Sequence, residues 1–284
     1  MWHKPGKAKI SLRRISRIFY VVLVICSFSL PLPTLGQKPA MPLEQGHSHN
    51  DYWRSKPLTD ALLRGFKSVE ADVFLMNGAL LVGHSANELQ PEVTLESLYL
   101  APLRVHMQKN KKLYRRPGIL YLYIDFKTEG KATYEQLVPV LLKYEEMLLT
   151  PRAENKKQGV QVILTGNYPR ELVLNDAHRL VYLDGKVEEL GSTLQAEYFP
   201  VVSGNWASFF KWRGQGEMPA AEAALLNKWN KIAKQNGQKI RFWNIAENNP
   251  AQTKAIWQEL LKHERLLVGT DHLDWLLEIL RYTN

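Results

Sequence analysis

The chain has 284 residues, of which 45% are hydrophobic and 23% charged, so it can form one sizeable globular domain or two small ones. Its formal net charge is +9, but six of the excess positive charges lie in residues 1–36, which contain no acid. Charge alone therefore gives no reason to expect a nucleic-acid partner. Cys26 is the only cysteine and lies in this first segment, so we expect no disulfide and no thiolate chemistry in the mature protein.

The first segment has the composition of a secretory signal peptide. Basic residues precede a short apolar run, residues 18–30, and a Pro-containing exit follows it. We predict that residues 1–36 are a signal peptide, cleaved near Gly36–Gln37, and that residues 37–284 form one domain. A membrane anchor is the alternative, although the run is shorter than the roughly 18–20 residues of a spanning helix. Export predicts a periplasmic or extracellular protein.

Short apolar segments alternate with amphipathic ones along the mature chain. The spacing predicts strands at residues 45–49, 68–75, 79–84, 119–126, 160–164, 180–183, 201–202, 240–245 and 266–269. It predicts helices at residues 57–64, 94–105, 134–149, 169–174, 220–235, 251–263 and 272–280. Strands that are apolar on both faces and alternate with helices indicate a buried parallel sheet.

This pattern predicts an α/β fold of the TIM (β/α)8 barrel type, because about eight strands in roughly 250 residues match the size of that barrel. An open doubly wound sheet is the second choice. It is disfavoured because the first strand is not followed by a Gly-rich phosphate loop.

Polar side chains follow many of the predicted strands, where the active site of a barrel lies. Glu70 and Asp72 are two residues apart in one strand, so both side chains point to the same face. Asp125 can supply a third carboxylate from a neighbouring strand. Two carboxylates held together repel each other unless a cation or a proton lies between them. Three oxygen ligands favour Mg²⁺ or Ca²⁺.

Three further residues can act around such a metal. His49 and His84 follow separate strands and can form an acid–base pair that works near neutral pH. Lys127 repeats the two-residue spacing after Asp125 and can stabilise a phosphate or an anionic transition state. A structural ion pair between Lys127 and a carboxylate is the alternative.

Four motifs resemble the PLC-like phosphodiesterase superfamily, which includes glycerophosphodiester phosphodiesterases, phosphatidylinositol-specific phospholipases C and sphingomyelinases D. They are HSHNDY at residues 47–52, VEADV at 69–73, GH at 83–84 and IDFK at 124–127. The His-Asn-Asp-Tyr start is most similar to the PLC-like group named after the yeast "altered inheritance of mitochondria" protein.

The resemblance implies a TIM barrel and assigns roles to the motif residues. Glu70, Asp72 and Asp125 match metal ligands, and Lys127 matches the lysine that follows the third ligand. His49 and His84 match catalytic histidines, although His47 competes with His49 for the first role. Weaker substrate-binding candidates are Asn50, Asn205 and Trp243, the last of which is similar to a late-strand tryptophan of glycerophosphodiesterases.

The resulting hypothesis is a secreted, metal-dependent phosphodiesterase that acts on glycerophosphodiesters or phospholipid head groups. Ser48, Asn50 and Asp51 depart from the His-Arg-Gly start of glycerophosphodiesterases, so they leave the substrate open. A lipid substrate would bring peripheral contact with a membrane surface, and the sequence makes no prediction of the oligomeric state. The alternative is a non-catalytic barrel that binds carbohydrate or lipid through aromatic residues: Trp206, Phe209, Phe210, Trp212 and Trp229. For most of these residues, however, we favour packing in the core or at the barrel rim over an exposed binding surface.

Overall fold

The computed structural model describes residues 1–2, 38–152, 157–191 and 196–283. The chain divides into two units, Met1–Leu35 and Gly36–Asn284, and all the motifs named above lie in the second. The expected signal peptide falls almost entirely outside the described residues, so it stays a prediction. Among the residues that are described, we find no helix with the length and apolar character needed to span a bilayer.

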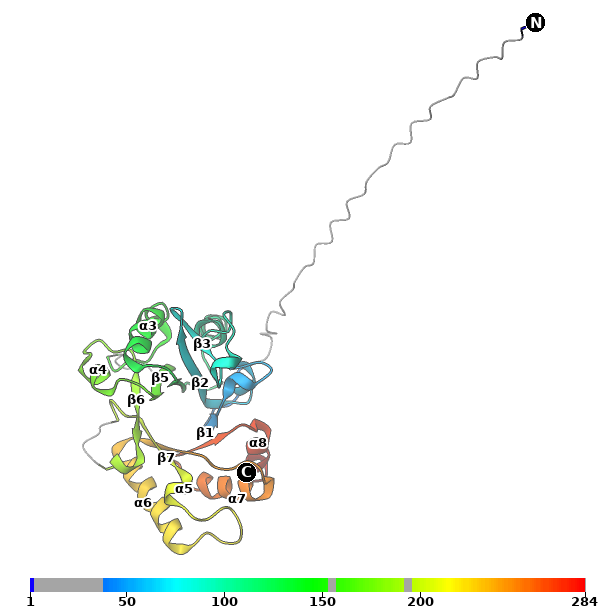
Figure 1. Ribbon diagram of the computed structural model, residues 1–284. Coiled ribbons are helices and arrows are strands. Elements are labelled where there is room, and N and C mark those ends of the chain that lie inside the picture. Colours follow the sequence, from blue (N-terminus) through cyan, green and yellow to red (C-terminus); the bar gives the residue numbers. More distant parts are fainter. Residues whose placement is uncertain (3–37, 153–156, 192–195, 284) are drawn as a thin grey trace. The chain divides into compact units, whose positions relative to one another are not determined.

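Eight parallel strands form a closed barrel, which confirms the expected TIM fold (Figure 1). The strand β1 (Leu43–Ser48) pairs with both β2 (Phe66–Met76) and β9 (Leu266–Thr270), and this double pairing closes the sheet and excludes the open doubly wound alternative. The other barrel strands are β4 (Ile119–Phe126), β5 (Gly159–Gly166), β6 (Tyr182–Lys186), β7 (Val201–Asn205) and β8 (Lys239–Trp243).

One further strand extends the sheet beside the barrel. β3 (Ala79–Val82) pairs antiparallel with the end of β2 through a turn at Asn77–Gly78. Both turn residues have positive φ, 50° and 78°, as a two-residue hairpin turn requires. The hairpin is as expected, but β3 ends at Val82 rather than at His84.

Helices cover the outside of the barrel (Figure 1). They are α1 (Thr59–Leu63), α2 (Ala101–Asn110), α3 (Gly130–Leu142), α4 (Arg170–Asn175), α5 (Trp206–Phe209), α6 (Ala220–Asn236), α7 (Pro250–Leu261) and α8 (Leu273–Thr283). The expected helix at residues 134–149 is wrong at both ends. The carboxylate of Glu129 caps the backbone N–H groups of Lys131 and Ala132, so α3 begins earlier, and α3 ends at Leu142.

The barrel interior has an apolar lower layer and a polar upper layer. The apolar layer is formed by inward side chains of five strands: Tyr123, Ile163, Tyr182, Val201 and Leu267. His47 and Arg241 rest on it, because the His47 ring lies 5.0 Å from the Tyr123 ring and the Arg241 guanidinium 4.8 Å above it. The polar layer therefore lies nearer the carboxyl ends of the strands than the apolar layer does.

The aromatic residues considered for a binding surface pack inward. Trp206 and Phe210 are buried, and their rings stack with centroids 4.1 Å apart. Phe209 and Trp229 contact the same cluster edge-on. The alternative of an exposed aromatic surface is therefore excluded for these rings, and the favoured packing in the core is confirmed.

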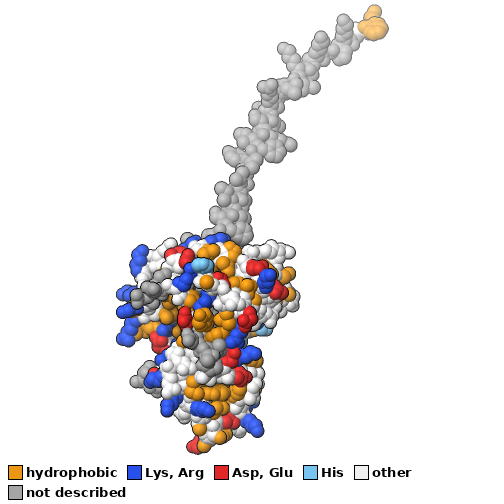
Figure 2. All heavy atoms as spheres, turned by 90° about the vertical axis from the view of Figure 1, so that its left-hand side faces the viewer, with side chains coloured by type: hydrophobic (Ala, Val, Ile, Leu, Met, Phe, Trp, Pro, Cys, Tyr) orange, Lys and Arg blue, Asp and Glu red, His pale blue; other side chains and the backbone are white. Residues whose placement is uncertain are grey.

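The molecular surface carries charges of both signs. Figure 2 shows one face, on which acidic and basic side chains are interspersed with hydrophobic ones. Exposed pairs such as Lys131–Glu135 at 3.9 Å contribute about 0–1 kcal/mol each. The stability of the fold therefore comes from the buried layers rather than from the surface charges.

Candidate active site and metal centre

Three carboxylates meet at the carboxyl ends of β2 and β4. The two strands pair in parallel register, so Asp72 lies directly beside Asp125. Glu70 precedes Asp72 on the same inward face, one layer lower. One oxygen from each of the three residues lies within 4.8 Å of the other two. The expected ligands are thus brought together in two ways. Asp72 and Asp125 are neighbours across the paired strands β2 and β4, and Glu70 and Asp72 lie two residues apart within β2.

The donor set fits a divalent cation with oxygen ligands. Asp72 is 1% exposed, and its Oδ1 has no hydrogen-bond partner within the described part of the chain. Burial, together with the charge of Glu70, raises the pKa of Asp72 to about 6. A buried carboxylate oxygen that accepts no hydrogen bond needs a compensating partner, such as a cation. A carboxylate cluster of this kind suits Mg²⁺ or Ca²⁺.

Lys127 neutralises the outer edge of this cluster. Its Nζ lies 2.8 Å from Asp125 Oδ2 and 3.0 Å from Asp72 Oδ2. Burial would lower the pKa of Lys127, but its bonds to the two carboxylates outweigh burial and raise it. The ion pair that we considered as an alternative is therefore present, and it places the ammonium group at the acidic cluster.

Arg241 is the main site residue that the sequence analysis did not single out. It is buried at the inward face of β8, and its Nη1 lies 2.5 Å from Glu70 Oε2. Its Nη2 lies 3.5 Å from Asp184 Oδ2, and its Nε donates to Ser203. The sequence did contain a signal for it, since Arg241 stands between apolar residues in a predicted strand. Burial of such a charge costs free energy unless the charge is paired with an acidic partner. Arg241 therefore fixes Glu70 from below.

His47 and His49 occupy different layers. His47 is 1% exposed, with Nδ1 2.6 Å from Ser68 Oγ and Nε2 3.0 Å from Glu70 Oε2. Burial lowers the pKa of His47 to about 4. Both ring nitrogens are occupied, so His47 orients Glu70. His49 lies two residues further on, and its half-exposed ring has Nε2 3.8 Å from Glu70 Oε1, which favours His49 for proton transfer.

His49 has a carboxylate partner, Asp271. Ser48, the last residue of β1, pairs with Thr270, the last residue of β9. The residues that follow them, His49 and Asp271, therefore also lie side by side. His49 Nδ1 is 3.0 Å from Asp271 Oδ1. Burial would lower the pKa of His49, but the bond to Asp271 and the charge of Glu70 outweigh it and raise it. A proton on Nδ1 leaves Nε2 facing the acidic cluster.

His84 lies on the other side of the carboxylates. Its side chain is 51% exposed, and its Nδ1 lies 3.6 Å from Asp72 Oδ2. The Tyr52 hydroxyl is 3.3 Å from this nitrogen and 2.9 Å from Asp72 Oδ2. The Trp53 ring lies 5.0 Å from the imidazole. The two imidazoles thus flank Glu70 and Asp72, as an acid–base pair requires.

The three weaker candidates have different surroundings. Asn50 is buried with φ 44°, and its amide donates to Asp271 Oδ1, so its contacts hold the His49 turn. Asn205 accepts from the Ala207 N–H and caps α5. Trp243 is 46% exposed and borders a cavity of about 360 Å³ that also reaches Asp184 and Arg241. Of the three, only Trp243 presents a free surface to a ligand at the barrel mouth.

Gly166 leaves the space that Asp125 occupies. It has φ +72°, and an added Cβ would lie 1.9 Å from Asp125 Oδ1. We therefore expect Gly166→Ala to displace this carboxylate and weaken metal affinity roughly 10- to 100-fold, measured by titration calorimetry. Gly78→Ala is the matched control, because Gly78 has φ +78° with no atom within 4 Å. Equal affinities for the two variants would contradict the placement of Asp125.

Glu70 is expected to matter for folding as well as for the site. Glu70→Ala leaves Arg241 with a buried charge whose 2.5 Å partner is gone, which costs about 3–5 kcal/mol of unfolding free energy. Asp72→Asn removes one of several neighbouring negative charges, so we expect little loss of stability in metal-free protein. Urea unfolding with EDTA measures both. A stable Glu70→Ala variant would show that Asp184 alone can hold Arg241.

The sequence model of the AIM6-like phosphodiesterase domain matches residues 38–184. The chain belongs to this family. The matched segment includes both candidate catalytic histidines, the three carboxylates and Lys127, which confirms the resemblance stated above. It ends before Arg241 and Asp271, which the fold brings to the site from β8 and from the end of β9.

Relatives in this family cover most of the chain. An altered inheritance of mitochondria protein 6 homolog from Arthroderma benhamiae is 28% identical over an alignment of 255 residues, which covers 80% of this chain and 81% of the relative with gaps left out. The altered inheritance of mitochondria protein 6 of Eremothecium gossypii is 36% identical over an alignment of 268 residues, which covers 82% of this chain and 67% of the relative.

Solved structures with the same fold include two phospholipases C. A calcium-dependent phosphoinositol-specific phospholipase C from Pseudomonas sp has a TM-score of 0.53 at 13% identity, covering 82% of this chain and 91% of its own. The phosphatidylinositol-specific phospholipase C of Listeria monocytogenes has a TM-score of 0.50 at 8% identity, and the match covers 87% of this chain and 96% of the phospholipase chain. At these identities the likeness shows the barrel fold alone.

Proposed function

We propose that this member of the AIM6-like phosphodiesterase domain family cleaves phosphodiesters of small alcohols, such as glycerophosphodiesters or phospholipid head groups, at a divalent metal. The observation that carries the proposal is the buried acidic cluster, in which Asp72 Oδ1 has no donor among the described residues. The half-exposed rings of His49 and His84 lie on either side of it. Glu70, Asp72 and Asp125 would hold Mg²⁺ or Ca²⁺.

The chemistry divides between proton transfer and charge stabilisation. One of His49 and His84 removes a proton from the nucleophile, which is water or a neighbouring hydroxyl of the substrate. The other donates a proton to the leaving alkoxide, and such transfers contribute about 10²–10⁴-fold each. Lys127 supplies positive charge for the non-bridging oxygens. The bound metal would act as a Lewis acid on the same oxygens. A water nucleophile gives hydrolysis, and a substrate hydroxyl gives a cyclic phosphate.

The barrel mouth supports a substrate with a polar head group. The cavity next to Trp243 is lined by Asp184, Lys186 and Ser203, which offer hydrogen bonds and a positive charge. Trp53 and Trp243 are 51% and 46% exposed, so their rings are free to contact a head group or a lipid surface. A peripheral membrane contact is therefore part of the proposal for lipid substrates.

The test is an assay of bis-p-nitrophenyl phosphate, glycerophosphodiesters and phospholipids with Mg²⁺, Ca²⁺ or EDTA, with phosphorus NMR of the product. We expect metal-dependent release of the alcohol or p-nitrophenol from the diester, and we expect EDTA to abolish it. The NMR spectrum of the phosphorus-containing product distinguishes a monoester from a cyclic phosphate. Full activity in EDTA would contradict the metal. Inactivity on every diester with either metal would favour a barrel that only binds its ligand.

We also propose that residues 1–36 direct export, so that the domain works in the periplasm or outside the cell. The basic start and the apolar run at residues 18–30 support this. N-terminal sequencing of the exported protein should begin near Gln37. A protein that keeps residues 1–36 and sediments with membranes would instead support an anchor.

A further inference from the structure

Arg54 lies just outside the acidic site and binds only main-chain oxygens in the described residues. Its Nη1 donates to the Asp271 carbonyl oxygen at 2.5 Å. Its Nη2 lies 3.0 Å from the His49 carbonyl oxygen and 3.2 Å from that of Thr270. A guanidinium carries five donors in a rigid fork, so one side chain can bridge several acceptors in a fixed geometry.

Two of these carbonyls, those of His49 and Asp271, belong to the loops that follow β1 and β9, and the third is that of Thr270, the last residue of β9. The last backbone bond between the two strands runs from the His49 N–H to the Thr270 carbonyl oxygen at 3.1 Å. Beyond it, the His49 and Asp271 carbonyls need other donors, and Arg54 donates to both. Arg54 therefore ties the two loops together just beyond the last backbone bond, next to the bond between His49 and Asp271.

The opposite side of the Asp271 loop is held by Glu247. One carboxylate oxygen of Glu247 accepts from the Asp271 N–H at 3.2 Å, and the other accepts from the Thr270 hydroxyl at 3.0 Å. The Asp271 carboxylate is then free to take His49 Nδ1 at 3.0 Å. The Asp271 backbone is thus fixed through its N–H by Glu247 and through its carbonyl by Arg54.

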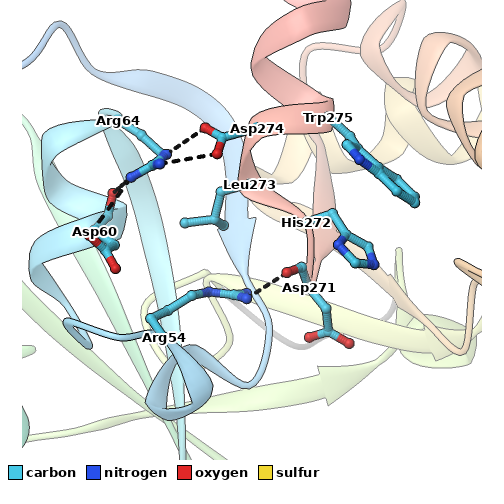
Figure 3. Close-up of a pocket in the computed structure, with 8 residues that line it drawn as sticks. All are labelled: Arg54, Asp60, Arg64, Asp271, His272, Leu273, Asp274 and Trp275. Atoms are coloured by element: carbon cyan, nitrogen blue, oxygen red, sulfur yellow. Dashed lines mark hydrogen bonds and ion pairs between the residues drawn. The ribbon is translucent and has the colours of Figure 1, made fainter.

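Arg64, in the same pocket, provides a natural comparison (Figure 3). Figure 3 shows Arg54 directed at Asp271, whereas Arg64 is directed at Asp274 and Asp60. Arg64 Nε lies 2.7 Å from Asp274 Oδ1 and its Nη2 3.1 Å from Asp274 Oδ2, which joins the end of α1 to α8, while its Nη1 donates to the Asp60 carbonyl within α1. The two arginines share a pocket and a charge, but only Arg54 bonds the segments that carry His49 and Asp271.

We propose that Arg54 is a positioning residue that keeps His49 bonded to Asp271, with Nε2 of His49 directed at the acidic cluster. This inference rests on the proposed function. Arg54 does not touch the substrate; it acts through the loop geometry. Without the guanidinium, the His49 and Asp271 carbonyls lose their shared donor, and the last backbone bond between the two segments is then the one from the His49 N–H to Thr270. The loops beyond that bond can then shift, and His49 loses the bond to Asp271 that fixes its tautomer and ring orientation.

The kinetic test compares Arg54→Gln with Arg64→Gln on a metal-dependent diester substrate. A misplacement of about 1 Å can cost about 100-fold, so we expect Arg54→Gln to lower kcat roughly 10- to 100-fold with KM nearly unchanged. Arg54→Lys should recover part of the loss, and Arg64→Gln should stay near wild type. In a His49→Ala background, Arg54→Gln should change kcat by less than about twofold, because its effect passes through His49.

Equal activity of Arg54→Gln and Arg64→Gln would overturn the proposal. So would a further 10- to 100-fold loss of kcat when Arg54→Gln is added to His49→Ala.

A second readout does not depend on turnover. NMR of the imidazole Nδ1–H of His49 should show a proton protected from exchange in the wild type and in Arg64→Gln, but not in Arg54→Gln. A protein inactive on every diester would refute the proposed function alone, and the NMR result would then decide the role of Arg54. A protected proton in Arg54→Gln would refute that role.

Discussion

Asp72→Asn should abolish metal-dependent phosphodiesterase activity while the barrel stays folded. In the part of the chain that the structure describes, Asp72 Oδ1 is a buried carboxylate oxygen without a donor, and the asparagine amide keeps the shape but removes the negative charge. A metal ion supplies several kcal/mol of transition-state stabilisation, so losing about 4 kcal/mol corresponds to roughly a thousandfold lower kcat/KM. The measurement is turnover of a glycerophosphodiester over a range of metal concentrations, together with calorimetric metal affinity.

The control for this substitution is Asp274→Asn. Asp274 lies on α8 with a side chain that is 74% exposed and pairs with Arg64, and it is not one of the three clustered carboxylates. It should bind metal and turn over substrate like the wild type. If Asp72→Asn bound Mg²⁺ or Ca²⁺ as tightly as Asp274→Asn, the acidic cluster would not be the metal site, whatever the activity.

His49→Ala and His84→Ala should each lower kcat on alkyl diesters by about 10²–10⁴-fold, because each removes one proton transfer. The two losses should respond differently to the leaving group. A p-nitrophenolate leaves without a proton, so the variant that lacks the general acid should recover much of its activity on bis-p-nitrophenyl phosphate. The variant that lacks the general base should stay slow on both substrates. Measuring kcat on the two substrate types therefore assigns the acid and the base.

The matched control is His178→Ala, because His178 is exposed and contacts Arg152 rather than the barrel mouth. His47→Ala is a second comparison. We expect it to weaken metal binding through Glu70 without a leaving-group effect, since His47 has both ring nitrogens occupied. A leaving-group effect in His47→Ala would make His47, rather than His49, the proton donor.

The sequence predicted the parts of the site that depend on local spacing. Glu70 and Asp72 share a face because a strand alternates sides every two residues, and this alternation holds in any sheet. Asp125 and Lys127 could be assigned to the same site because they stand at the end of a similar apolar strand. The helix limits were less predictable, as α3 shows. Its start depends on the Glu129 cap and its end at Leu142 on local turns.

Other features depended on which strands become neighbours. Arg241 is 171 residues from Glu70, and Asp271 is 222 residues from His49, so no local spacing connects either pair. The aromatic residues near α5 and α6 look alike in the sequence whether they are exposed or buried. Only the packing of α6 against the barrel shows that Trp206 and Phe210 are core residues.

By itself, then, the sequence determined the alternation of strands with helices and the shared face of Glu70 and Asp72, because both follow from local periodicity. The tertiary structure decided that the sheet closes into a barrel, through the pairing of β1 with β2 and β9, and how the surroundings of His47 and His49 differ. Closure of β1 against β9 buries His47 beneath Glu70 and places His49 beside Asp271. The physical reason is that a residue's layer and partner in a barrel are set by the register between distant strands.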